Sequence, residues 1–308
     1  MPTPEDINAA AARIDGHVHV TPIIESEAFG LCYPVAFKLE NTQLTGSFKV
    51  RGAFNTLLSL SVPEAGVVAA SGGNHGAAVA FAARALGHPA TIFVPELAGP
   101  AKIALVREMG ADLHVVPGVY ADALSAAKAH ENASGAMQIH AYDAEPTVAG
   151  QGTLMWEWEN QGLDADTVLI AVGGGGLIGG ALAWLQGRRK VIAVEPQTAP
   201  TLNAALVAGR EVDVDVDVGG VAASSLGARR IGSIGFDLAR RQGIESVLVS
   251  DDAITEAQRL LWSGLRQWVE PGGATALAAL TSGVYKPAPG ERIAVLLCGA
   301  NPAPGPFD

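Results

Sequence analysis

The chain of 308 residues is long enough for two domains or one large α/β unit, and 37 glycines predict many tight connections. A net charge of −11 argues against general affinity for nucleic acid or anionic membranes, which bind positive surfaces, but not against a small anion held by backbone N–H groups. Two cysteines are too few for a disulfide framework, and no apolar run approaches the roughly 20 residues of a membrane helix, so we expect a cytoplasmic protein.

From about residue 66, short apolar runs alternate with helical stretches. Strands that are apolar along their whole length, alternating with helices, are typical of parallel sheets covered on both faces. The segment 212–221, "VDVDVDVGGV", instead places aspartate on one face, which predicts an exposed edge or loop. We expect strands in "GVVAAS", "ATIFVP", "DLHVVP", "AMQIHAY", "TVLIAV", "VIAVEP", "SVLVS" and "RIAVLL", and helices between them, including a long one from Asp252 to Glu270 and a shorter one after Gly273.

Two sets of strands predict an α/β fold of two lobes, each with a mainly parallel sheet flanked by helices. The small domain would comprise residues 63–142, and the large domain residues 1–62 and 143–308. In such proteins, ligands bind in clefts at the carboxyl ends of the strands. The side chains and loops that follow the predicted strands are therefore the candidates for a functional site.

The stretch "TGSFKVRGA" places Lys49 between Phe48 and a valine. Lysine is rarely enclosed by apolar neighbours, and a surface lysine with its head in water is the ordinary interpretation. The alternative is a lysine held in a cleft for Schiff-base chemistry. Removal from water lowers the pKa of such an amine, which makes it a nucleophile and later a base.

The stretch "TVLIAVGGGGLIGGALAWL" predicts a strand, a glycine run and a helix, an arrangement suited to binding phosphate. Gly174, Gly176 and Gly179 satisfy G-x-G-x-x-G, and Glu195 ends the next strand, where a ribose-binding acid would stand. By itself this segment is compatible with a nicotinamide-dependent dehydrogenase, or with a turn needed only for close packing.

A second loop, "SGGNHG", also lies between a predicted strand and a predicted helix. Ser71 and Asn74 suit a helix N-cap, and the same groups could bind a carboxylate or a ring oxygen. Cys298 follows the closing strand, where it is either a buried small hydrophobe or a partner for a ring nitrogen. Pyridoxal phosphate would unite these features, since its aldehyde needs a lysine, its phosphate a helix N-terminus and its ring nitrogen a partner.

The motifs "TGSFKVRGA", "SGGNHG", "AGQGT", "GGGGLIGG", "VEPGGA" and "LLCGAN" stand in the order and approximate spacing of one family. The chain resembles, from Thr21 to Asn301, the threonine/serine dehydratases and serine racemases, which are pyridoxal-phosphate enzymes of fold type II. The resemblance implies pyridoxal 5'-phosphate as cofactor and Lys49 as the catalytic residue that binds its aldehyde. Further cofactor contacts are implied for Phe48, Asn74, Gly173, Gly174, Gly175, Gly176, Leu177, Gly220 and Cys298, and substrate contacts for Ser71, Asn74 and His75.

The implied activity is dehydration and deamination of a small hydroxy amino acid, L-threonine or L-serine, to a 2-oxo acid and ammonia. Serine racemase and hydroxyaspartate ammonia-lyase activities are the alternatives within the family. Serine racemases carry an acid/base serine at the position of Gly72, and glycine has no proton to offer, which favours elimination. The role of Glu270, which matches a family acid, is left open.

Three further expectations come from the resemblance. Cation-binding members use a glutamate, a carbonyl and an aspartate; Glu195 and Ala199 match, but Thr201 replaces the aspartate, so we expect no metal. The chain stops soon after the closing strand, so we expect no C-terminal regulatory domain. A homodimer is expected as in the family, with no nucleic acid or membrane partner.

Overall fold

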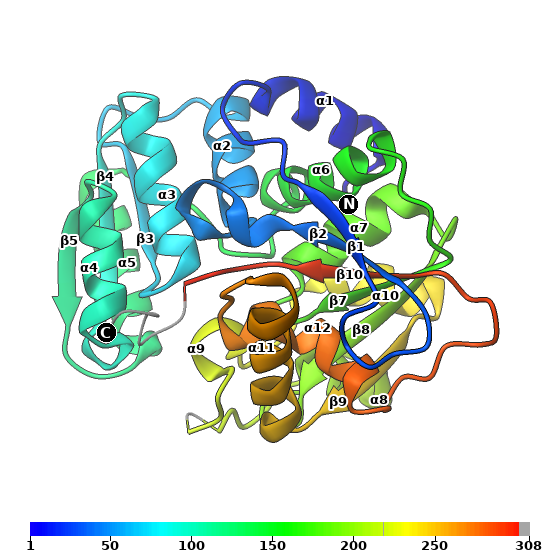
Figure 1. Cartoon of the computed structure of the whole chain (residues 1–308). Coiled ribbons are helices and arrows are strands. Elements are labelled where there is room, and N and C mark those ends of the chain that lie inside the picture. Colours follow the sequence, from blue (N-terminus) through cyan, green and yellow to red (C-terminus); the bar gives the residue numbers. More distant parts are fainter. Residues whose placement is uncertain (218, 302–308) are drawn as a thin grey trace.

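A computed structural model describes residues 1–217 and 219–301. Its larger sheet has six strands in the order β1-β2-β10-β7-β8-β9, and only β1 runs antiparallel to its neighbour. Strand β10, the last in the chain, therefore lies inside the sheet, between β2 and β7 (Figure 1). The strands are β1 (Ile23–Ser26), β2 (Val35–Leu39), β7 (Thr167–Ala171), β8 (Lys190–Pro196), β9 (Glu245–Val249) and β10 (Ile293–Leu297).

The smaller sheet has four parallel strands in the order β5-β4-β3-β6. They are β3 (Val67–Ala70), β4 (Ala90–Pro95), β5 (Asp112–Val116) and β6 (Met137–Gln138). Each strand predicted from an apolar run is present, although β6 is only two residues long. The prediction of two lobes with mainly parallel sheets is confirmed.

Helices cover both sheets (Figure 1). Helix α12 packs against β7, β8, β9 and β10, whereas α5 packs against β3 and β4. The largest hydrophobic core surrounds the six-stranded sheet, and separate clusters fill the four-stranded lobe. The α-helices are α1 (Pro4–Ile14), α2 (Lys49–Ser59), α3 (Asn74–Ala85), α4 (Pro100–Glu108), α5 (Tyr120–Ser134), α6 (Glu145–Asn160), α7 (Gly176–Leu185), α8 (Thr201–Ala208), α9 (Ala223–Leu226), α10 (Ser233–Gln242), α11 (Asp251–Leu265) and α12 (Pro271–Thr281).

The long helix expected from Asp252 to Glu270 is wrong at its end. Helix α11 stops at Leu265, and Arg266 turns into the left-handed region with φ 56°. Pro271 then holds the residue before it, Glu270, in an extended conformation, because a proline ring clashes with a helical predecessor. Glu270 is therefore the N-cap of α12, which begins before the glycine pair rather than after it.

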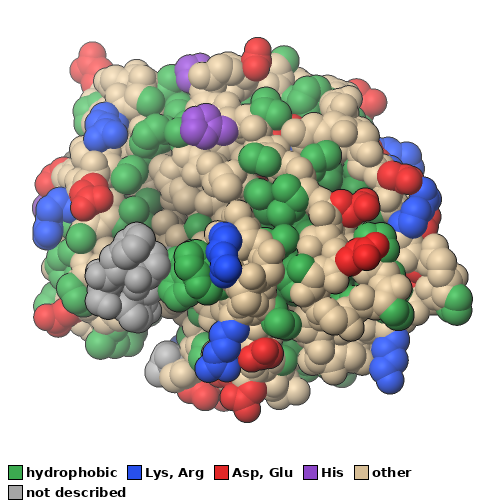
Figure 2. All heavy atoms as spheres, in the orientation of Figure 1, with side chains coloured by type: hydrophobic (Ala, Val, Ile, Leu, Met, Phe, Trp, Pro, Cys, Tyr) green, Lys and Arg blue, Asp and Glu red, His purple; other side chains and the backbone are tan. Residues whose placement is uncertain are grey.

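The segment 212–221 forms no strand among its described residues. Its aspartates are exposed, and two of them lie near arginines: Asp213 is 3.6 Å from Arg230, and Asp215 is 3.7 Å from Arg229. On the face shown in Figure 2, lysines and arginines lie among aspartates and glutamates rather than forming one basic patch. Within the described part of the chain, no helix combines the length and the apolar character needed to cross a membrane.

Helix α2 packs against α3 of the smaller lobe and α6 of the larger one. Its apolar side chains Val50, Phe54 and Leu57 belong to the core of the four-stranded lobe. The helix thus bridges the two lobes, even though the predicted boundary at residue 62 assigns it to the large domain. That boundary remains a proposal.

A buried cluster of charges fixes α2 on its other side. The Arg51 guanidinium is 1% exposed and donates to Glu40 at 2.7 and 2.9 Å and to Glu157 at 2.9 Å. Lys38 donates to the same Glu157 carboxylate at 2.5 Å. Removing one member of such a cluster leaves an unpaired buried charge, a loss of about 3–5 kcal/mol.

The "AGQGT" motif acts through close packing. A Cβ atom at Gly150 would lie 2.7 Å from the Arg51 carbonyl, and one at Gly152 would lie 2.9 Å from the Gly180 carbonyl. Both distances are shorter than a Cβ contact allows, so glycine is required where α6 meets α2 and α7. The motif therefore sets the position of the helix that begins with Lys49.

Candidate active site

The segment before α2 is tied to the end of β10. Ser47 forms an antiparallel bridge with Gly299, and the Phe48 N–H donates to the Cys298 carbonyl at 3.2 Å. The chain turns into this bridge through Thr45 and Gly46, both with positive φ. Lys49 and Cys298, far apart in sequence, are thereby brought together at the carboxyl end of β10 in the six-stranded sheet.

The side chain of Lys49 is half-buried, with its amine turned toward the protein. Its Nζ donates to the Ala141 carbonyl at 3.0 Å and stands 5.1 Å from the centre of the Phe48 ring. Loss of hydration lowers the pKa of Lys49 to about 8, with the nearby Cys298 and Glu270 acting in the opposite direction. A substantial fraction of the amine is thus neutral, and nucleophilic, near physiological pH.

The glycine run connects β7 to α7, and β7 is the strand next to β10. Gly175 has φ 92°, a conformation that glycine adopts without strain. A Cβ at Gly174 would overlap the ring of Tyr142, and one at Gly176 would lie 2.9 Å from the Tyr142 Cα. The first turn of α7 presents backbone N–H groups without intrahelical partners, which suits a phosphate.

Cys298 directly follows β10 and is 4% exposed. Its Sγ lies 3.5 Å from the Gly272 carbonyl at the start of α12. Burial, followed by the charge of Glu270, raises the pKa of the Cys298 thiol to about 12. The group therefore stays a thiol at neutral pH, a weak donor next to the glycine loop.

The "SGGNHG" loop follows β3 and faces the same cleft from the other lobe. The N-cap of α3 is Gly73, so neither Ser71 nor Asn74 caps the helix. The Ser71 hydroxyl instead accepts from the Gly73 N–H at 3.2 Å. The Asn74 Nδ2 donates to Glu270 Oε1 at 2.5 Å, and its Oδ1 accepts from Asn301 at 2.7 Å, which leaves one amide hydrogen for a ligand.

His75 is buried, and its Nε2 lies 2.9 Å from the Ile139 carbonyl. Burial and the charge of Lys49 lower the pKa of His75 to about 3. The ring is therefore neutral, donates to that carbonyl and provides no positive charge for a carboxylate. Of His75, only the backbone N–H suits the expected role of substrate contact.

Gly220 is buried beside Thr198 and Asp217, on the segment that leads to α9. Its expected contact with a ring face remains a proposal. Two buried charged residues also lie in this region: Glu270, whose role the sequence left open, and Lys102, which the structure adds; they are 2% and 7% exposed. Glu270 belongs to the "VEPGGA" motif, but Lys102 lies in an ordinary helical stretch, where the pattern predicts a solvated lysine.

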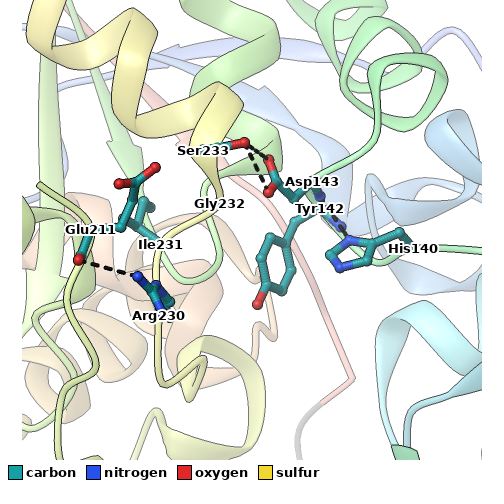
Figure 3. A pocket seen from close by; sticks show the side chains of 8 residues that line it. All are labelled: His140, Tyr142, Asp143, Glu211, Arg230, Ile231, Gly232 and Ser233. Atoms are coloured by element: carbon teal, nitrogen blue, oxygen red, sulfur yellow. Dashed lines mark hydrogen bonds between the residues drawn. The ribbon is translucent and has the colours of Figure 1, made fainter.

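A cavity of about 270 Å³ is lined in part by Tyr142 (Figure 3). Its lining residues come from the turn after β6 and from the chain before α10: His140, Tyr142, Asp143, Glu211, Arg230, Ile231, Gly232 and Ser233. The Asp143 carboxylate accepts from the Ser233 hydroxyl at 3.1 Å and from the Ile234 N–H at 3.0 Å. The cavity borders the glycine loop, because the N–H of its lining residue Gly232 donates to the Gly174 carbonyl at 3.0 Å.

Glu195 does not act as a ribose-binding acid. The side chain is 0% exposed and accepts from the Leu202 and Asn203 N–H groups, both at 2.8 Å, at the start of α8. The Thr201 hydroxyl lies 3.1 Å from this carboxylate and 2.6 Å from the Gly173 carbonyl. Among the described residues, no group of three or more histidines, cysteines, aspartates or glutamates is placed to hold a metal ion.

The residues present fit pyridoxal phosphate. A partly neutral amine, a helix N-terminus and a protonated thiol stand at neighbouring strand ends, where the ligand offers an aldehyde, a phosphate and a ring nitrogen. The buried Ser47 hydroxyl and Glu270 Oε2 also have no hydrogen-bond partner among the described residues. Unpaired buried oxygens of this kind are typical of a site built around a polar ligand.

Comparison with known proteins supports this fit. The family model described as "Pyridoxal-phosphate dependent enzyme" matches residues 14–299. The chain is 37% identical to a phenylserine dehydratase of Ralstonia pickettii (96% of this chain, 93% of that protein) and 33% identical to an L-threonine ammonia-lyase of Thermotoga maritima (98% and 76%). The structure of maize serine racemase matches with a TM-score of 0.90 at 30% identity, covering 97% of this chain and 94% of that one.

We predict that Thr201 supports cofactor binding through Gly173. Replacing it by valine removes the hydroxyl and leaves the Gly173 carbonyl without its donor, a loss of about 1–3 kcal/mol for a buried group. Titration of the cofactor-free T201V protein with pyridoxal phosphate, followed by fluorescence, should give a Kd about tenfold higher, because 1.4 kcal/mol corresponds to a factor of ten. T201S keeps the hydroxyl and should bind as the wild type does; equal Kd values for T201V and T201S would refute this role.

Proposed function

We propose that this chain, which belongs to the family of pyridoxal-phosphate-dependent enzymes, converts L-threonine and L-serine to 2-oxo acids and ammonia. Elimination from hydroxy amino acids is the activity named among its relatives, as dehydratase or ammonia-lyase. The observation that carries the proposal is the half-buried Lys49 amine, held by the Ala141 carbonyl and near enough to the Cys298 thiol for their charges to interact.

When bound, the cofactor withdraws electrons from the substrate, so that the α-hydrogen becomes acidic enough for a side chain to remove. Lys49 would hold the cofactor aldehyde until the substrate amine replaces it. Its freed amine, with a pKa near 8 rather than 10.5, then acts as the base that takes the α-proton. The β-hydroxyl would depart as water by taking up one proton, which balances the α-proton taken by Lys49, and the unsaturated amine released into solution would hydrolyse to the 2-oxo acid and ammonia.

Cys298 supports elimination over slower side reactions. A carboxylate opposite the ring nitrogen would keep that nitrogen protonated, whereas a thiol with a pKa near 12, whose one hydrogen is directed at the Gly272 carbonyl, would offer the ring at most a weak interaction. The ring is then a weaker electron sink, and prompt loss of the β-substituent is favoured. The Asn74 amide, held by Glu270 and Asn301, would direct its remaining hydrogen at the phenolic oxygen of the cofactor.

We predict that the holoenzyme releases ammonia and 2-oxo acid from L-threonine and L-serine. A panel of L-threonine, L-serine, L-threo-3-hydroxyaspartate and L-threo-3-phenylserine, each followed by coupled detection of ammonia, tests this. Higher kcat/KM for the first two supports the proposal. A preference of more than tenfold for hydroxyaspartate or phenylserine would overturn the substrate assignment, and no turnover of any of them would overturn the activity.

Gly72 bears on the racemase alternative. Racemisation needs an acid/base on the face of the substrate opposite Lys49, and Gly72 has no side chain to provide one. The structure also leaves no room for a side chain at this position. A Cβ at Gly72 would overlap the Ala98 methyl group and lie 3.0 Å from Val94 Cγ1. Substituting serine at this position alone would therefore strain the loop.

We predict that a serine at position 72 introduces racemisation only when space is made for it. G72S combined with A98G should convert L-serine to D-serine measurably faster than the wild type, as followed by chiral chromatography. A98G alone is the matched control and should keep the elimination activity without gaining racemisation. The argument fails if the double variant racemises no faster than A98G, or if the wild type already racemises as fast as it eliminates.

We further propose that the enzyme works as a homodimer in the cytoplasm. Both cysteines are free thiols, with Cys32 exposed and Cys298 buried, which suits a reducing compartment. The exposed Trp262 and Trp268 stack edge to face at 5.9 Å, an apolar surface of the kind that subunits cover.

A further inference from the structure

Lys102 is a buried lysine without a carboxylate partner in contact. It lies on α4, a helix in which only Lys102 and Val106 are buried. The side chain is 7% exposed, although lysine is almost never enclosed unless it is paired. Its Nζ donates to the Ser224 carbonyl at 2.7 Å, and it forms no ion pair with the residues that the structure describes.

This hydrogen bond crosses from one lobe to the other. Val106, one turn along α4, belongs to the core of the four-stranded lobe. Ser224 lies on α9, whose Leu226 belongs to the core of the six-stranded lobe. The next residue, Ser225, accepts from the Gly272 N–H at 3.2 Å, which fastens α9 to the first turn of α12.

Glu270, the N-cap of α12, supplies the opposite charge. Burial lowers the pKa of Lys102 and raises that of Glu270, and each charge counteracts the shift of the other. The Oε1 of Glu270 accepts from Asn74, whereas its buried Oε2 has no partner among the described residues. In a site closed to water, opposite charges attract over longer distances than at the surface.

The bond lies directly against the loop that precedes α3. A Cβ placed on Gly73 would be 3.7 Å from the Lys102 Nζ and 3.7 Å from the Ser224 carbonyl. The neighbouring Asn74 is held by Glu270 itself. Any separation of α4 from α9 would therefore expose the loop proposed to receive the substrate carboxylate.

We propose that Lys102 is a positioning residue that holds the two lobes closed over the substrate, by binding the Ser224 carbonyl across the cleft while Glu270 balances its charge. Closure of this kind excludes water and completes the binding loop, and breaking it raises the substrate concentration needed for saturation. The kinetic part of this inference rests on the proposed function; the structural part does not.

The test compares K102M, which keeps an unbranched side chain up to the position of Cε and removes the amine and its charge, with K102R and with K128M in the holoenzyme. Lys128 is exposed on α5 of the same lobe, so K128M controls for the loss of a lysine. K102M should raise KM for L-threonine about tenfold with a smaller change in kcat, as expected when a hydrogen bond from a charged donor is lost. K102R should recover part of this loss, and K128M should match the wild type.

Hydrogen–deuterium exchange separates a residue that holds the lobes together from one that only stabilises the fold. Loss of the first should speed exchange only where the two lobes meet. In K102M, amides of α4, α9 and residues 71–75 should exchange faster, while those of β7, β8 and β10 stay unchanged. Unchanged KM and unchanged exchange would overturn the proposal, as would faster exchange spread evenly through both lobes. If the wild type turns over none of the substrates, the proposed function fails, but the exchange comparison still decides whether Lys102 holds the lobes together.

Discussion

Partial removal of the Lys49 ammonium from water is the constraint on which the rest of this structure depends. A charged amine in a poorly hydrated site costs free energy, and the cost appears as a pKa near 8 instead of 10.5. That cost is sustained only if the surrounding framework prevents the side chain from swinging out into solvent. The bridge from Ser47 to Gly299, the bond from Phe48 to the Cys298 carbonyl and the bond from Lys49 to the Ala141 carbonyl provide this restraint.

The framework extends well beyond the lysine itself. Helix α2 is fixed on one side by the buried Arg51 cluster and on another by the close contact with α6 at Gly150. The glycine loop is held by Thr201 at the start of α8. The Thr201 hydroxyl contacts both the Gly173 carbonyl and the Glu195 carboxylate. Parallel strands that end at a common edge then bring the amine, the loop and the thiol together.

Much of this arrangement could be predicted from the sequence because it is local. The apolar strands, the glycine run after "TVLIAV" and the unusual setting of Lys49 are all visible in short windows. The strand order was not visible, since β10 enters the sheet between β2 and β7 through contacts far apart in the chain. The prediction of one helix through Glu270 is wrong for a related reason. Arg266, in the left-handed region, ends α11, and the proline at 271 makes Glu270 the N-cap of α12, which places it in the site.

Side chains whose partners lie on the other lobe could be assigned from the sequence only in part. Lys102 has the pattern of a solvated helical lysine, and only the fold places its amine against Ser224. Ser71 and Asn74 have the pattern of caps, yet Gly73 caps α3 and the Asn74 amide faces Glu270. The sequence alone shows that Gly72 has no proton donor, but the obstacle formed by Ala98 is a property of the folded chain.

The most direct test of this account is to identify the lysine that binds the cofactor. The protein is mixed with pyridoxal phosphate between pH 6 and 10, reduced with borohydride and digested, and the labelled peptide is located by mass spectrometry. We expect the label on Lys49, with a labelling rate that rises with pH and reaches half its maximum near pH 8, because only the neutral amine reacts. Labelling spread over exposed lysines, or a midpoint near pH 10, would contradict the central claim.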